Sequence, residues 1–346
     1  MDRLRLLDAG LRAFDARLPA VTPSLCVVTR YRASTCRRCL DVCPGSAITC
    51  EVWLSVAPDL CSSCGACAAV CRTGALSFDG RSAALRAALA AAAASAEPSA
   101  TLVCRPAEAA LAAAGASVPA VVVPCLGGVA AADLVAAAAL GVAVELVTGR
   151  CEDCSQAAAG ACLPATLEAS QATLAALGVH ASCSRRALEG TLTADDRADP
   201  GTAAGAAAGD AGLSRHELFS FLARGVRRTV AEAAAPERRG IEELHRQAPP
   251  PVAHDRLLDD LAALCPTSTA AAVALPPALP LAELTVGAGC DGCGLCVRYC
   301  PHEALTLADG RAVWNGAACT ACGLCAEVCP PGALELDPGV LRPASS

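Results

Sequence analysis

Cysteine is the residue type with the most chemical potential in this chain, which has 24 cysteines among 346 residues. Two runs near the C-terminus share the spacing Cys-x2-Cys-x2-Cys-x3-Cys-Pro: Cys290, Cys293, Cys296 and Cys300 before Pro301, and Cys319, Cys322, Cys325 and Cys329 before Pro330. Three thiolates on one tight loop can bind three irons of a cubane, while a fourth points toward a neighbouring cluster. Structural zinc also uses Cys-x2-Cys pairs, but it needs neither the third cysteine nor the proline. The spacing therefore predicts two 4Fe–4S clusters.

The C-terminal segment, residues 279–340, resembles the bacterial two-cluster ferredoxins in both of these runs. Between the runs, the sequence predicts two strands joined by an Asp309-Gly310 turn, which is the hairpin expected there. The resemblance implies that each run gives its fourth cysteine to the other cluster. One cluster is then held by Cys290, Cys293, Cys296 and Cys329, and the other by Cys319, Cys322, Cys325 and Cys300.

The N-terminal segment carries a second group of cysteine runs. Cys61, Cys64, Cys67 and Cys71 repeat the full spacing, with Arg72 in place of the usual proline. Upstream, Cys36, Cys39 and Cys43 precede Pro44. That upstream run is incomplete, because Ala33 stands where its first cysteine would be.

Two interpretations of this N-terminal segment compete. In the first, a single cluster is bound by Cys61, Cys64, Cys67 and Cys43. In the second, another cluster is bound by Cys36, Cys39 and Cys71, with Cys26 as a distant fourth ligand. Three preorganised thiolates without a ligand role would be unusual, so we favour the second interpretation; otherwise Cys26 is a buried thiol on a strand. Cys50 has no companion in the sequence and is expected to be an isolated buried thiol.

The middle of the chain has a different sequence pattern, in which short apolar runs are separated by helical stretches. The helical stretches end at Gly115, Gly141 and Gly178, where a left-handed cap is favoured. Alternation of this kind predicts a parallel sheet covered by helices. Cys104, Cys125, Cys151 and Cys183 are each expected at the C-terminal end of a strand, and Cys154 and Cys162 follow in the third loop. These strand ends share one edge of a parallel sheet, so the cysteines should converge in space.

The stretches VVVPCLGGV and VELVTGRCEDCS are similar to parts of the small iron–sulfur delta subunit of methyl-viologen-reducing hydrogenases. The resemblance implies a further small cluster, of the 2Fe–2S type, held by Cys104, Cys125, Cys151 and Cys154. Two other readings stay open: reduced thiols in a packed sheet, and a redox-active dithiol formed by Cys151 and Cys154.

The bulk composition limits the partners. A net charge of −7 and a pI near 5.3 argue against nucleic acid, whose phosphates need clustered positive charge. The opening residues lack the apolar stretch of a secretory signal, and no apolar run is long and uncharged enough for a transmembrane helix. We therefore expect a cytoplasmic protein with no transmembrane segment. No phosphate-binding loop or nucleophile motif indicates a small-molecule substrate.

The predicted fold class is α+β, with two ferredoxin-like 4Fe–4S modules flanking a small α/β parallel-sheet domain and with helical linker segments. The expected parts are an amphipathic helix at 1–20, a ferredoxin-like module at 24–80, the α/β domain at 100–185, a flexible linker at 186–213, a helical segment at 214–278 and the two-cluster module at 279–340.

Three functional hypotheses follow from these parts. The first is an electron-transfer subunit that serves a partner oxidoreductase, such as a formate dehydrogenase or hydrogenase by analogy with related modules. The second is a redox sensor or maturation factor that uses the cysteines of the middle domain. The third is an enzyme whose active site is a cluster in that domain; the sequence shows no catalytic residues for it.

Overall fold

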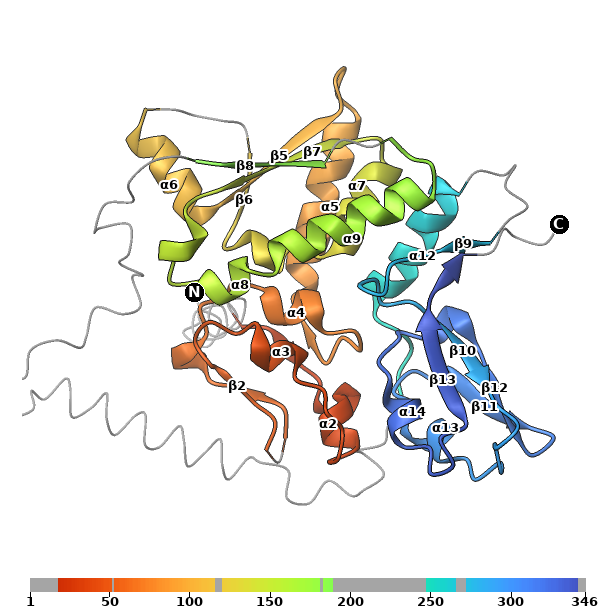
Figure 1. The fold of residues 1–346 in the computed structure, drawn as a ribbon. Helices are drawn as coiled ribbons and strands as arrows, with labels where there is room; N and C mark the ends of the chain where they lie inside the picture. Colours follow the sequence, from red (N-terminus) through yellow and green to blue (C-terminus); the bar gives the residue numbers. More distant parts are fainter. Residues whose placement is uncertain are drawn as a thin grey trace, which may run out of the picture.

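The computed structural model describes residues 18–51, 53–115, 120–180, 183–188, 247–265 and 272–341. The expected helix at 1–20 falls almost entirely outside these residues, as do most of the linker at 186–213 and the start of the helical segment at 214–278. In Figure 1 the described residues form three parts: an N-terminal unit (red to orange), a middle sheet with its helices (orange to green) and a C-terminal unit (blue).

The middle part contains the parallel sheet that the sequence predicts. Its strands are β5 (Ser99–Cys104), β6 (Val121–Val123), β7 (Ala143–Thr148) and β8 (Cys183–Ala187). They are all parallel and lie in the order β6-β5-β7-β8. The chain leaves β5 toward β6 on one side and then returns to place β7 on the other side, so the connections diverge between β5 and β7. A crevice at the carboxyl ends of such strands is the usual ligand site of an open sheet.

One expectation about this sheet is wrong. Cys183 begins β8, where it pairs with Val144, instead of ending a strand. Cys183 therefore lies at the amino-terminal end of the parallel strands, whereas Cys104 lies at their carboxyl end. The apolar run before Cys183 is not a strand in the described residues, because α9 and its cap extend to Gly178.

The helices of the middle part are α5 (Asp79–Ala93), α6 (Arg105–Ala113), α7 (Ala131–Ala139), α8 (Ala157–Gly160) and α9 (Leu163–Ala176). Gly115, Gly141 and Gly178 follow the ends of α6, α7 and α9, each with a φ of +70°. Only glycine adopts this conformation without a steric penalty, which explains where these helices stop.

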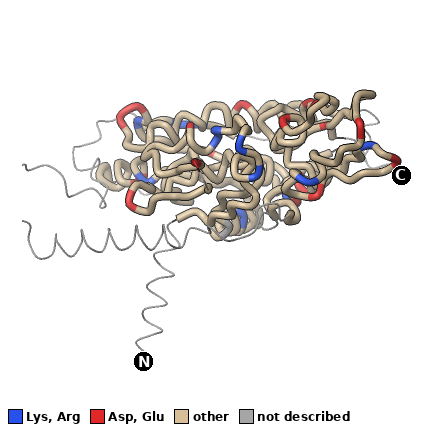
Figure 2. Tube along the Cα trace, turned by 90° about the horizontal axis from the view of Figure 1, so that it is seen from below, with Lys and Arg blue, Asp and Glu red and all other residues tan. Residues whose placement is uncertain are grey.

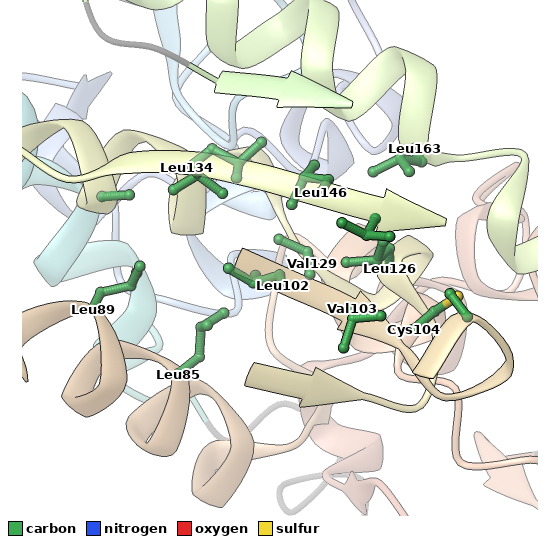
Figure 3. Packing of buried hydrophobic residues seen from close by; sticks show 14 of the residues in the cluster. Leu85, Leu89, Leu102, Val103, Cys104, Leu126, Val129, Leu134, Leu146 and Leu163 are labelled. Carbon is green, nitrogen blue, oxygen red and sulfur yellow. The ribbon is translucent and has the colours of Figure 1, made fainter. Parts of the chain in front are cut away.

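The core of the middle part lies between the sheet and its helices. Leu102 and Leu146 of the two central strands are almost fully buried, and Figure 3 shows them among leucines of the neighbouring helices. Leu85 and Leu89 come from α5, and Leu134 comes from α7. Cys104 lies at the end of β5 on the margin of this core. Packing of the central strands therefore fixes the position of the first cysteine of the crevice.

The N-terminal unit is built from short elements around its cysteine loops. Its strands form two antiparallel pairs, β1 (Ala20–Val21) with β4 (Leu76–Ser77) and β2 (Ile48–Thr49) with β3 (Ser55–Val56). Its helices are α2 (Val27–Arg30), α3 (Arg38–Asp41) and α4 (Ala66–Val70).

The C-terminal unit repeats this plan with longer strands. β10 (Ala282–Val286) pairs with β13 (Leu334–Pro338), and β11 (Leu305–Ala308) pairs with β12 (Arg311–Trp314). Its helices are α13 (Leu295–Tyr299) and α14 (Leu324–Glu327). Asp309 and Gly310 both have positive φ, 50° and 71°, as the predicted tight turn of the hairpin requires.

Helix α12 (Val252–Leu264) connects the parts. It packs on α7 of the middle domain, and Arg86 of α5 forms a two-fold hydrogen-bonded ion pair with Asp260 at 2.7 and 2.6 Å. Beyond α12 the expected helical segment ends earlier than residue 278, because β9 (Val273–Ala274) pairs with β14 (Val340–Leu341).

None of the helices in the described residues has the length and hydropathy needed to span a bilayer. Figure 2 shows acidic and basic positions interspersed along the described chain. The net negative charge is therefore spread over the molecule in this view, and it does not mark out one docking face.

The Arg86–Asp260 pair gives a prediction about stability. Asp260 is 5% exposed, so Asp260→Asn should leave the Arg86 guanidinium without its charge partner. We expect a loss of about 2 kcal/mol in the free energy of unfolding, below the value for a fully buried pair because Arg86 is partly exposed. Urea denaturation followed by circular dichroism measures this loss. Glu145→Gln, which breaks the exposed pair with Arg186, is the control and should cost less; equal losses would contradict the account.

Candidate metal centres

One backbone turn recurs after the last cysteine of all four runs. The residue three positions later has a positive φ in each case: Ser46 (49°), Gly74 (65°), Glu303 (56°) and Gly332 (62°). In two of the runs the next backbone N–H donates to the cysteine sulfur, from Ala47 to Cys43 at 3.2 Å and from Ala333 to Cys329 at 3.3 Å. Amide hydrogen bonds of this kind stabilise a thiolate ligand and tune an iron–sulfur cluster.

A second repeated feature marks the three complete runs. The second and fourth residues after the first cysteine are left-handed: Ser63 and Gly65, Gly292 and Gly294, and Ala321 and Gly323. The corresponding residues of the incomplete run are Thr35 and Arg37, and neither has a positive φ. The loop that would carry a first cysteine at position 33 therefore has a different path.

Two sets of four cysteines in the C-terminal unit each line one cavity. Cys290, Cys293, Cys296 and Cys329 surround the first, and Cys300, Cys319, Cys322 and Cys325 surround the second. Each set contains three cysteines of one run and the fourth cysteine of the other. These are the two groupings that the resemblance to two-cluster ferredoxins implies.

A corresponding cavity lies in the N-terminal unit. Cys61, Cys64, Cys67 and Cys43 line it together with apolar residues such as Ile48 and Phe78. This is the grouping common to both interpretations of the N-terminal sequence. The described side chains form no three-ligand site for a single metal ion. Each set of four thiols lies around a cavity instead.

The second N-terminal set also comes together, but it has five members instead of four. The thiol of Cys26 interacts with those of Cys36, Cys39 and Cys71. The interaction with the Cys50 thiol, assisted by backbone hydrogen bonds from Thr29 and Val28, outweighs burial and lowers the pKa of Cys26 to about 6. A thiolate at this position is suited to bind iron.

Cys50 lies in the same apolar core as Cys26 and Cys39. It is therefore not the isolated thiol that we expected. A signal was available in the spacing, because Cys50 follows Cys43 by seven residues, as Leu307 follows Cys300 in the complete module.

In the middle domain, the predicted convergence of cysteines occurs for one set of four. Cys104, Cys125, Cys151 and Cys154 line a single cavity at the carboxyl ends of β5, β6 and β7. Neither Cys162 nor Cys183 belongs to this lining. The cavity therefore lies at the point where the connections of the sheet diverge.

Burial is the largest influence on the pKa of several of these thiols. It raises the pKa of Cys67, Cys125 and Cys322 to about 12 in each case. Buried thiols of this kind carry no charge at neutral pH without a positive partner, so the charge of iron would be needed to keep them as thiolates. Four sulfurs in an apolar cavity, with amide hydrogen bonds to some of them, fit a 4Fe–4S cluster in the ferredoxin-type sites.

The middle cavity and the first N-terminal cavity are immediate neighbours. Cys125 and Cys64 pack in the same small cluster, together with Ala159. A Cβ added at Gly128 would lie 2.4 Å from the Cys64 carbonyl oxygen, so only glycine allows the two backbones to approach this closely.

Two arginines, the buried Arg30 and the half-buried Arg72, join the N-terminal and C-terminal units. Arg30 donates to the carbonyl oxygens of Arg298, Tyr299 and Cys300 at 3.2, 2.8 and 3.1 Å. Arg72 donates to the Ala321 carbonyl oxygen at 2.7 Å and to the Pro277 carbonyl oxygen. Burial lowers the pKa of Arg72 to about 10, so this guanidinium is still positively charged at neutral pH.

Comparison with known proteins agrees with the geometry at both ends of the chain. Residues 289–333 match the family described as 4Fe-4S dicluster domain, and residues 54–77 match the 4Fe-4S binding domain. Both ends carry ferredoxin-type 4Fe–4S domains. No curated protein and no solved structure matches the chain. The matches establish an iron–sulfur protein with 4Fe–4S clusters, and domains of this type indicate electron transfer with a redox partner.

The second N-terminal set gives a prediction about its fourth ligand. Cys26→Ala should remove one N-terminal cluster, because Cys26 packs in one apolar core with Cys39 and Cys71 and lies close enough to Cys36 to affect its charge. We expect about four fewer irons per chain in anaerobically purified protein. Cys265→Ala, outside every described cysteine set, is the matched control and should keep its iron. An unchanged iron content in Cys26→Ala would remove Cys26 from the ligands.

Proposed function

We propose that this chain passes single electrons through multiple 4Fe–4S clusters, to or from a partner oxidoreductase. The observation that carries the proposal is that the cysteine sets form a continuous series in space. Each set lies beside the next, from the middle domain through the N-terminal unit to the C-terminal unit. Each 4Fe–4S cluster, when bound, would accept and release one electron at a time. The protein would supply the thiolates, hydrogen bonds to sulfur and a positively charged, water-poor environment.

The order of the sets follows from their contacts. The middle set touches the first N-terminal set through Cys125 and Cys64. The two N-terminal sets share one small core, in which Cys67 packs with Cys26. The second N-terminal set reaches the C-terminal unit, because Cys36 packs in the same apolar cluster as Cys319 and Cys322. Electrons entering at one end would therefore meet a thiol set at every step toward the other end.

The middle set would extend this path by one further centre. We assign Cys104, Cys125, Cys151 and Cys154 to a small cluster, of the 2Fe–2S type that the hydrogenase delta subunit suggests. Their common cavity and the contact with the neighbouring N-terminal set support the assignment. This end of the path would then face the partner, and a cytoplasmic setting would suit it because thiols stay reduced there.

A sensor or maturation factor is the second candidate. It is favoured by the position of Cys151 and Cys154, which are only half-buried at the end of the path. In that case the ferredoxin-type modules would deliver electrons to a switch in the middle domain.

Iron and sulfide quantitation on anaerobically purified protein tests the main proposal. Four 4Fe–4S clusters predict about sixteen irons per chain, and a 2Fe–2S cluster in the middle domain adds about two. EPR of the reduced protein should show interacting clusters. Iron near eight would limit the path to the C-terminal unit, and colourless, iron-free protein would contradict the proposal.

Replacing Cys151 and Cys154 with Ala separates the two candidates. In an electron-transfer subunit the double variant should lower the rate at which electrons pass to an acceptor. If that rate is unchanged and activation of a partner is lost, the sensor or maturation role is correct.

Arg72 gives a prediction about potentials. Its half-buried guanidinium lies close to Cys36, Cys319 and Cys322, so it would stabilise the additional negative charge of a reduced cluster on either side. Arg72→Gln should therefore lower the midpoint potentials of the flanking clusters in an EPR-monitored titration. Arg37→Gln, which removes an exposed arginine of the same unit, is the control. Equal midpoints in wild type and Arg72→Gln would show that the charge has no such effect.

A further inference from the structure

Trp314 lines the same cavity as the Cys322 set, which consists of Cys300, Cys319, Cys322 and Cys325. Its indole nitrogen Nε1 is buried and has no hydrogen-bond partner among the described residues. Two further buried atoms in this lining share that property, Oγ1 of Thr320 and Nε2 of His302. Native proteins rarely leave buried polar groups unsatisfied, because the loss of their water is then uncompensated. The partner of these atoms must therefore come from what the cavity holds.

The indole nitrogen restricts the identity of that partner most strongly. It carries one N–H, it can only donate, and it does not titrate. The thiols of the Cys322 set do not accept its hydrogen bond in the described structure. A 4Fe–4S cluster on these thiols would bring inorganic sulfides into the cavity, and hydrogen bonds to cluster sulfurs are one of the means by which proteins set cluster potentials.

Strand pairing and one glycine hold the indole beside the cavity. Trp314 is the last residue of β12 and pairs with Leu305, which lines the same cavity. A Cβ added at Gly316 would lie 2.9 Å from the ring atom Cη2, so glycine at this position leaves room for the six-membered ring. The fold therefore fixes the indole where its N–H meets the contents of the cavity.

The N-terminal module has a valine at the corresponding position. Val56 is the last residue of β3 and precedes Cys61 by five residues. Trp314 precedes Cys319 by the same number. Val56 lines the first N-terminal cavity. One backbone position thus faces a cysteine cavity in both modules, with an apolar side chain in the N-terminal one and a hydrogen-bond donor in the C-terminal one.

We propose that the indole N–H of Trp314 donates a hydrogen bond to an inorganic sulfide of the second C-terminal cluster. Such a donor stabilises the reduced cluster, which carries one more negative charge, and so raises its reduction potential. The Cys322 set is the one that faces the N-terminal unit, because Cys36 packs in the same apolar cluster. Trp314 therefore favours passage of an electron from the N-terminal unit into the C-terminal unit. This inference rests on the proposed electron-transfer function.

Trp314→Phe tests the inference in the full chain, because it keeps an aromatic ring and removes the N–H donor. We expect the iron content of the wild type and, in an EPR-monitored redox titration, a lower midpoint potential for one cluster. The chain has two tryptophans, so labelling with ¹⁵N-tryptophan gives a second readout. Pulsed EPR of the reduced, labelled protein should show a ¹⁵N coupling that Trp314→Phe abolishes.

Trp53→Phe is the matched control, because Trp53 lies between β2 and β3 and does not line the cavity of the Cys322 set. It should change neither the ¹⁵N coupling nor the midpoint that Trp314→Phe lowers. Unchanged midpoints in Trp314→Phe, or a wild type without the ¹⁵N coupling, would overturn the inference. If Trp314→Phe loses iron, the coupling in the wild type still decides. Failure of the proposed function gives a different result, since the coupling would then persist in a protein that passes no electrons to an acceptor.

Discussion

The described structure depends on the close approach of cysteine loops that belong to different parts of the chain. An electron can pass between buried centres only if no thick layer of protein separates them. Gly128 lets the middle domain touch the loop of Cys64, and Arg30 and Arg72 tie the N-terminal loops to carbonyl oxygens of the C-terminal unit. A guanidinium that leaves water retains its charge when carbonyl oxygens accept its hydrogen bonds, so the same contacts that hold the units together also place positive charge beside the cysteine sets.

Much of this arrangement could be predicted because local spacing dictates it. The Cys-x2-Cys-x2-Cys loop forces left-handed residues at fixed positions, and the complete runs at Cys61, Cys290 and Cys319 all show them. The parallel sheet was predictable for a similar reason, since Gly115, Gly141 and Gly178 end helices between short apolar runs. The convergence of Cys104, Cys125 and Cys151 then follows from the common direction of β5, β6 and β7.

The predictions that failed concern interactions that the spacing of residues along the chain does not encode. Cys183 was assigned to the wrong end of a strand, because an apolar run does not show where pairing begins. Cys50 looked isolated because its partners, Cys26 and Cys39, come from a helix start and an incomplete run. The role of Arg72 was also hidden, since its carbonyl partners lie about 200 residues or more away in the chain. Contacts between units follow from tertiary packing and leave little trace in local sequence.

Anomalous diffraction at the iron absorption edge, from crystals grown anaerobically, tests the central claim most directly. The account predicts separate iron peaks inside all five cysteine sets, with the peak of the Cys104 set next to that of the Cys64 set and the Cys36 set facing the Cys322 set. Peaks confined to the C-terminal unit, or N-terminal peaks that have no neighbour across the Arg30 and Arg72 contacts, would contradict a continuous path through the chain.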